Sequence, residues 1–195
     1  MDELSVRVSR LQRTAWRIRD ARPVCCDLPF ALALMTDERV HHDLPALIGR
    51  LPSETPILIV FRHYGVPTGE RLDLAERAYR TAKSRGHFLV VARGGIAADG
   101  VHNGRGPGFR SGAVHSLAQG VARSASRTLN LAFVSPVLST ASHPDSRPLG
   151  PVRAAAIAGR LDCPAFALGG MNRVSAQRLI GSPFAGIAVL SAIRT

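Results

Sequence analysis

The sequence predicts an α/β fold in which a parallel sheet closes into a (β/α)8 TIM barrel. Eight short apolar runs follow one another along the 195 residues, and helix-like segments lie between most of them. That alternation is typical of parallel sheets, and eight is the number of strands that closes such a barrel. An open doubly wound sheet is the alternative. The chain has no GxGxxG and no Walker loop, so nucleotide-binding versions of that sheet lack support.

Residues 1–22 are expected to form an N-terminal helix, which is clearest over residues 4–18. Apolar side chains recur there at three- and four-residue steps, at Leu4, Val8, Leu11, Ala15 and Ile18. Such a stripe is typical of a helix with one buried face. Arginines lie off the stripe, and Pro23 follows the expected end of the helix.

The remaining elements are predicted from apolar runs with the length of strands buried on both faces. These runs are Phe30–Met35, Ile57–Phe61, Phe88–Ala92, Gly100–His102, Gly112–His115, Leu131–Val137, Ala165–Leu168 and Gly186–Leu190. Helices are predicted near residues 43–51, 69–85, 116–126, 150–161 and 173–181. Only about residues 95–98 and 103–110 separate strands three, four and five, so we expect shortened helices after strands three and four. We expect residues 1–195 to form a single domain.

Charge is unevenly distributed along the chain. The formal net charge is +11, yet residues 100–195 contain only two acidic residues, Asp145 and Asp162. A basic half is compatible with an anionic metabolite or with nucleic acid. Aromatic residues make up only 5% of the chain, and no RNA- or DNA-binding motif is present. The sequence therefore disfavours nucleic-acid binding.

Compartment and metal binding are constrained by three further features. The start of the chain, Met1-Asp2-Glu3, lacks the basic residues and apolar segment of a signal peptide. No apolar run reaches the ~18 residues that a membrane helix needs. The three cysteines are odd in number and have no CxxC spacing, which disfavours a disulfide framework and a zinc site. We expect a cytoplasmic protein with no membrane segment and no bound metal.

Two histidines lie at the ends of predicted strands. His115 is well placed for general acid/base catalysis, because the ordinary pKa of imidazole lies near neutrality. A purely structural role for His115 is equally compatible with the pattern. For His102, a packed and hydrogen-bonded histidine is the favoured interpretation.

Candidate phosphate-binding residues follow the last three strands. Gly169 and Gly170 precede a helix, and paired glycines let backbone N–H groups approach an anion. Ser191 follows the last strand, and in barrels the loops after strands seven and eight often form a phosphate site. The polar segment after strand six offers further groups, at Thr140, Ser142 and His143.

Together these segments resemble the thiamine phosphate synthase and TenI family over about residues 29–193. The segment CPAFALGGMNRVSAQRLIGSPFAGIAVLSAI (residues 163–193) resembles the close of that family. ADGVH (98–102) is similar to its fourth-strand signature, and LAFVSPVLSTASHPDSRPLG (131–150) to its sixth strand and loop. The resemblance is closest to TenI-like domains fused to Nudix hydrolases. It implies a TIM barrel and a link to thiazole or thiamine phosphate metabolism.

The sequence departs from the synthase pattern at the magnesium site. The resemblance implies aspartates after strands three and four, where this chain has Arg93 and the run Gly104–Pro107. Magnesium prefers carboxylate oxygens, so an arginine in that place would repel it. Of the strand-two motif, only Arg62 is retained. We therefore expect no cofactor, with magnesium needed only if the chain is a synthase.

The resemblance implies that the thiazole phosphate half of the site is retained. Gly169, Gly170 and Ser191 match its phosphate cup, Thr140 and Ser142 its loop hydroxyls, and His143 replaces a loop lysine. His115 matches the histidine that TenI-like thiazole tautomerases are taken to use for proton transfer. The leading hypothesis is a thiazole phosphate-binding protein with tautomerase activity. The alternatives are a thiamine phosphate synthase with an altered pyrophosphate site and a non-catalytic binding paralogue, and a homodimer is considered.

Overall fold

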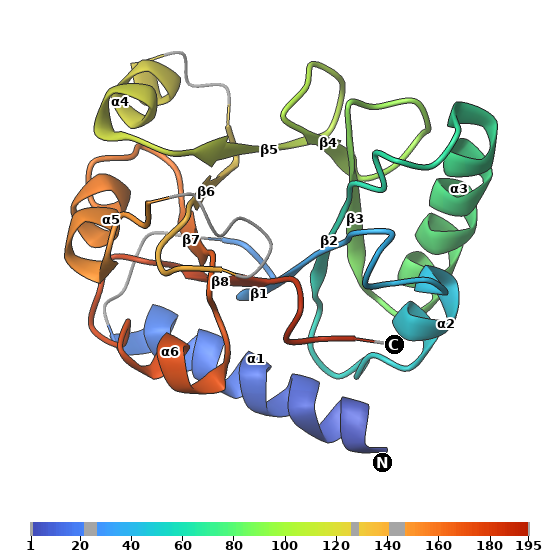
Figure 1. The fold of residues 1–195 in the computed structure, drawn as a ribbon, viewed down its shortest axis with the longest axis horizontal. Helices are drawn as coiled ribbons and strands as arrows, with labels where there is room; N and C mark the ends of the chain where they lie inside the picture. Colours follow the sequence, from blue (N-terminus) through green and yellow to red (C-terminus); the bar gives the residue numbers. More distant parts are fainter. Residues whose placement is uncertain (1, 22–26, 126–128, 141–146, 195) are drawn as a thin grey trace.

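The computed structural model describes residues 2–21, 27–125, 129–140 and 147–194. Its eight strands form one closed, parallel barrel in the order of the sequence (Figure 1). The strands are β1 (Leu32–Met35), β2 (Leu58–Phe61), β3 (Phe88–Ala92), β4 (Gly100–His102), β5 (Phe109–Val114), β6 (Leu131–Val134), β7 (Ala165–Leu168) and β8 (Gly186–Val189). The predicted (β/α)8 barrel is confirmed, and the open sheet is excluded because β8 pairs with β1.

Helices cover only part of the barrel. Those of the described chain are α1 (Glu3–Ala21), α2 (Leu44–Gly49), α3 (Thr68–Ser84), α4 (Leu117–Ala125), α5 (Pro151–Ala158) and α6 (Arg173–Gln177). The expected shortening after strands three and four goes further than predicted, because residues 93–99 and 103–108 contain no helix. Instead, the glycine-rich segment 103–108 folds back, and Gly106 lies against the side chain of Val101 on the outer face of β4.

Two apolar clusters stabilise the barrel. The inner cluster fills the space within the strands with aromatic rings, and the centroid of the Phe166 ring lies 6.2 Å from those of Phe30 and Phe133. The outer cluster packs strand residues such as Leu34 and Val91 against the helices. The barrel interior is thus a packed core, and ligand chemistry is confined to its ends.

α1 covers the seam between the last and first strands, where no helix follows β8 among the described residues. Its apolar stripe, from Leu4 to Ile18, is buried in the outer cluster. Arg19, near its end, is 7% exposed and reaches the start of both seam strands. Its guanidinium donates to the carbonyl oxygens of Ala185 (2.9 Å), Leu28 (2.8 Å) and Phe30.

We predict that Arg19→Met lowers the free energy of unfolding by about 3 kcal/mol or more. Methionine keeps the apolar stem, yet it leaves three carbonyl oxygens without the charged donor that satisfies them. Urea denaturation followed by circular dichroism measures the change. Arg17→Met, at an exposed position of the same helix, should change stability by less than about 0.5 kcal/mol. Equal stability of the two variants would show that Arg19 does not hold the seam.

Candidate functional site

His115 lies just beyond the carboxyl end of β5, at the mouth of the barrel. Its Nδ1 is 2.8 Å from the carbonyl oxygen of Ser135, which follows β6. A carbonyl can only accept a hydrogen bond, so Nδ1 carries the proton and Nε2 has its lone pair available. No hydrogen bond in the described part of the chain occupies Nε2. The ring is exposed, so Nε2 is accessible to a ligand as a proton acceptor.

Neighbouring groups fix the orientation of this ring. The Ser135 hydroxyl lies 3.3 Å from Nδ1, and the backbone N–H of His115 donates to Oε1 of Gln119 at 2.9 Å. Gln119 belongs to α4, whose first turn follows directly after the strand. His115 is therefore held between β5, β6 and α4, as general acid/base catalysis requires.

Gly169 and Gly170 form a tight loop at the end of β7. Both have left-handed backbone angles, with φ of +97° and +67°. The loop packs closely against the segment after β6, where the N–H of Leu138 donates to the Gly169 carbonyl at 3.1 Å. A Cβ at Gly170 would lie 2.7 Å from the Cβ of Leu138. Only glycine satisfies both the backbone angle and this close approach.

The amide groups of this loop and of the β8 end form a candidate anion cup. No hydrogen bond within the described residues occupies the backbone N–H of Gly169, Gly170 or Ser191. The two segments adjoin, because Leu168 of β7 pairs with Ala188 of β8. Ser175 supports the cup from below by donating to the Gly170 carbonyl at 2.8 Å. Unoccupied amides on neighbouring loops can hold a phosphate group.

The segment after β6 is only partly described. Thr140 is half-buried and follows the stretch that packs on Gly169 and Gly170. Ser142 and His143 lie outside the described residues.

Arg62 lies on the other side of the mouth, at the end of β2, and is not part of the cup. Its Nε donates to the Thr36 carbonyl at 2.9 Å, and its backbone N–H donates to the Thr36 hydroxyl at 3.0 Å. Burial lowers the pKa of Arg62. No hydrogen bond among the described residues occupies its terminal nitrogens, so they are available to a carboxylate or phosphate.

Two more arginines make this side of the mouth strongly basic. Arg71 donates to the Ala92 carbonyl at 2.6 Å, and Arg93 lies over the ring of Tyr64 at 4.7 Å. The described residues contain no group of three or more His, Cys, Asp or Glu side chains that could hold a metal ion. Arginine at the position after β3 does not fit a magnesium ion, whose ligands are oxygen atoms.

Comparison with known proteins gives a family match over the half of the barrel that carries His115 and the cup. The family model described as thiamine monophosphate synthase matches residues 111–193. Over these residues, which make up less than half of the chain, the protein is similar to the thiamine monophosphate synthase/TenI family. No curated protein sequence matches.

Two solved structures are similar to this chain in fold. A thiamine phosphate pyrophosphorylase from Pyrococcus furiosus superposes with a TM-score of 0.69 at 21% identity, covering 82% of this chain and 85% of that one. The YdjI aldolase from Escherichia coli K12 gives a TM-score of 0.57 at 12% identity, covering 92% and 81%. At these identities the likeness shows the fold alone. The described residues contain no helix long and apolar enough to cross a membrane.

His102 is buried beneath the mouth, as its sequence context favoured. Asn103 accepts from the N–H of Ala113 at 2.9 Å, so its amide nitrogen faces Nε2 of His102 at 3.1 Å. Nε2 therefore accepts, and Nδ1 donates to the Ser111 hydroxyl at 3.0 Å. Burial is the main reason why the pKa of His102 falls to about 4, so the ring is neutral at neutral pH.

A second buried network, which sequence reasoning missed, holds Arg62 in place. The Thr36 hydroxyl lies 2.9 Å from Nδ1 of His63, and Nε2 of His63 lies 3.4 Å from the His41 carbonyl. Nε2 of His41 in turn donates to the Ile193 carbonyl at 2.8 Å. These residues come from three separate loops at the ends of β1, β2 and β8. Only the barrel brings them together, so no local spacing in the sequence could reveal them.

We predict that Gly170→Ala lowers the free energy of unfolding by at least about 2 kcal/mol and weakens phosphate-ligand binding. The added Cβ must adopt a left-handed conformation, which costs about 1 kcal/mol, and must also displace Leu138. Gly181→Ala is the matched control, because its φ is +85° and no atom lies within 4 Å of its Cβ position. Equal losses in the two variants would mean that the close approach at Gly170 is unimportant. Urea denaturation and calorimetric titration measure the two effects.

Proposed function

We propose that the protein binds a thiazole phosphate at the barrel mouth and acts as a thiazole tautomerase. The observation that carries this proposal is the geometry of His115, whose Nδ1–H is bound to the Ser135 carbonyl while Nε2 remains accessible. The match of residues 111–193 to the thiamine monophosphate synthase family model supports a thiamine-related phosphorylated ligand. The amides of Gly169, Gly170 and Ser191 would hold its phosphate.

The proposed reaction requires only a proton shift. Nε2 of His115 takes a proton from one position of a non-aromatic tautomer of a thiazole carboxylate phosphate, and the imidazolium so formed returns a proton to another position, so that the ring becomes aromatic. Atoms and electrons balance without an oxidant or a metal ion. The proton-bearing Nδ1 stays on the Ser135 carbonyl, which stabilises the imidazolium formed after proton transfer. Thr140 and Ser142 are proposed to orient the ring, and His143 to lie near the phosphate.

We expect His115→Gln to reduce kcat for thiazole tautomerisation by about 10²–10⁴-fold, the usual contribution of a general acid/base. KM should change little, because the phosphate contacts remain. Ser135→Ala should cost less than tenfold, since it removes the 3.3 Å hydroxyl contact and keeps the carbonyl acceptor. The assay follows conversion of the thiazole carboxylate phosphate without metal. Full activity of His115→Gln would overturn the mechanism, and binding without turnover by the unaltered protein would indicate a non-catalytic paralogue.

The basic side of the mouth favours a second candidate, a thiamine phosphate synthase with an altered pyrophosphate site. Arg62, Arg71 and Arg93 lie at or near the ends of β2 and β3, and guanidinium groups bind phosphate oxygens in pairs. Arg105, on the exposed segment after β4, could add a fourth charge.

If the protein is a thiamine phosphate synthase, incubation with both the pyrimidine pyrophosphate and the thiazole phosphate yields thiamine phosphate. Product formation should then not require magnesium, and Arg62→Gln should abolish it because that guanidinium would neutralise the leaving group. No product with or without magnesium rejects this candidate and leaves the tautomerase proposal standing.

A further inference from the structure

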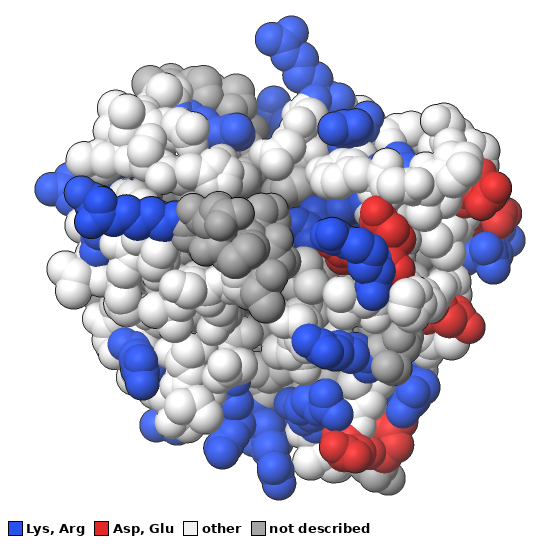
Figure 2. Space-filling model, viewed as in Figure 1, with Lys and Arg blue, Asp and Glu red and all other residues white. Residues whose placement is uncertain are grey.

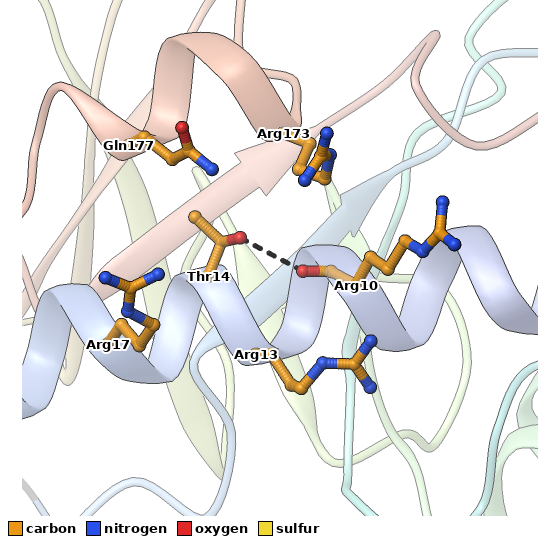
Figure 3. Close-up of a pocket in the computed structure, with 6 residues that line it drawn as sticks. All are labelled: Arg10, Arg13, Thr14, Arg17, Arg173 and Gln177. Atoms are coloured by element: carbon orange, nitrogen blue, oxygen red, sulfur yellow. Dashed lines mark hydrogen bonds between the residues drawn. The ribbon is translucent and has the colours of Figure 1, made fainter.

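A hollow of about 510 Å³ lies on the outside of the barrel, between α1 and α6 (Figure 3). α1 contributes Arg10, Arg13, Thr14 and Arg17, and α6 contributes Arg173 and Gln177. None of these residues belongs to the mouth. Four of the six lining side chains are therefore cationic, and none is acidic.

The arginines of the hollow are not used to stabilise the fold. Arg10, Arg13 and Arg17 recur at three- and four-residue steps on the exposed side of α1, opposite its buried stripe. Within the described residues, none of the four guanidinium groups takes part in an ion pair or a hydrogen bond. Elsewhere on the surface, Arg7 pairs with Glu3 at 3.3 Å and Arg50 with Asp2 at 2.8 Å. Unpaired arginines on two facing helices repel one another, so the hollow lowers its electrostatic energy by taking up an anion.

No acidic side chain lines the hollow, and the exposed Asp20, three residues beyond Arg17 on α1, is not among its lining residues. Figure 2 shows basic side chains gathered at the lower edge over α1 and α6, with acidic side chains on the right of the view and at the lower right, near the N-terminal end of α1. The ligand must therefore bring its own negative charge.

We propose that this hollow binds a small, multiply charged phosphate anion of the oligophosphate class. Arg10 and Arg17 are about 10 Å apart along the helix axis, at 1.5 Å per residue, which suits several linked phosphates. Guanidinium groups match phosphate oxygens two at a time, and the amide of Gln177 can donate a further hydrogen bond. The volume is within the range of small-molecule sites.

Nucleic acid is the less favoured occupant. No aromatic side chain lines the hollow, so bases would have nothing to stack on.

The protein provides a local reporter for this site. Trp16 is the only tryptophan of the chain, and it lies on α1 beside Arg17, half-buried under the guanidinium of Arg19 at 4.5 Å. Its fluorescence therefore responds to charge bound at α1 and should respond little to ligands at the mouth.

The test is a titration with inorganic tripolyphosphate at ~150 mM salt, followed by Trp16 fluorescence. We expect saturable binding by the unaltered protein and at least tenfold weaker binding by the double variant Arg10→Gln/Arg17→Gln. The matched control is Arg153→Gln/Arg160→Gln, which removes two exposed arginines from the α5 region and lowers the net charge equally. It should bind as the unaltered protein does.

Three results would overturn the proposal. One is the absence of saturable binding. Another is equal weakening in the two double variants, which would show a response to net charge alone. The third is tighter binding of a single-stranded oligonucleotide than of tripolyphosphate, which would make the surface a nucleic-acid site. The outcome is independent of tautomerase activity, because neither double variant alters the mouth.

Discussion

The functional end of this protein depends on the pairing of β8 with β1. This pairing, with Leu32 opposite Ile187 and Leu34 opposite Val189, closes the sheet and fixes where each strand ends around the mouth. A seam between the first and last strands has no short connection to hold it. Arg19 and the apolar face of α1 supply that restraint from outside. The N-terminal helix α1 therefore helps to keep the barrel closed.

The closed barrel places two chemically different sets of groups on the two sides of its mouth. The ends of β5 to β8 contribute an accessible imidazole nitrogen and unoccupied backbone amides, a set suited to moving a proton on a phosphorylated ligand. The ends of β2 and β3 contribute the guanidinium groups of Arg62 and Arg93, and the first turn of α3 contributes that of Arg71; these contact Thr36, Tyr64 and Ala92, respectively. Positive charge there attracts anionic groups of a ligand and disfavours a divalent cation. The two proposed reactions differ in which of these two sides they would use.

Much of the fold could be predicted because its signals are local. Two strands, β3 and β7, have the predicted bounds, since each is an apolar run interrupted at both ends. Strand β6 ends earlier than predicted, at Val134, before Ser135 and Pro136, and proline has no N–H for the ladder. Strand β5 begins earlier, at Phe109, whose N–H donates to the carbonyl of Asp99, directly before the neighbouring strand β4. That pairing depends on β4, so the predicted apolar run Gly112–His115 contains no signal for it.

The site was less predictable because its geometry is non-local. The pairing of His115 with the Ser135 carbonyl joins residues 20 positions apart through a backbone oxygen, which any residue type could provide. Asn103 fixes the His102 tautomer through a left-handed backbone, with φ of +49°. The sequence indicates that the arginines of α1 lie off its apolar stripe. Only the structure shows that Arg173 of α6 lies beside them.

A crystal structure with a bound thiazole carboxylate phosphate tests the central claim most directly. We expect the phosphate to lie on the backbone N–H groups of Gly169, Gly170 and Ser191, with the thiazole ring within hydrogen-bond distance of Nε2 of His115. A phosphate held by Arg62 and Arg93, with the ring away from His115, would contradict it.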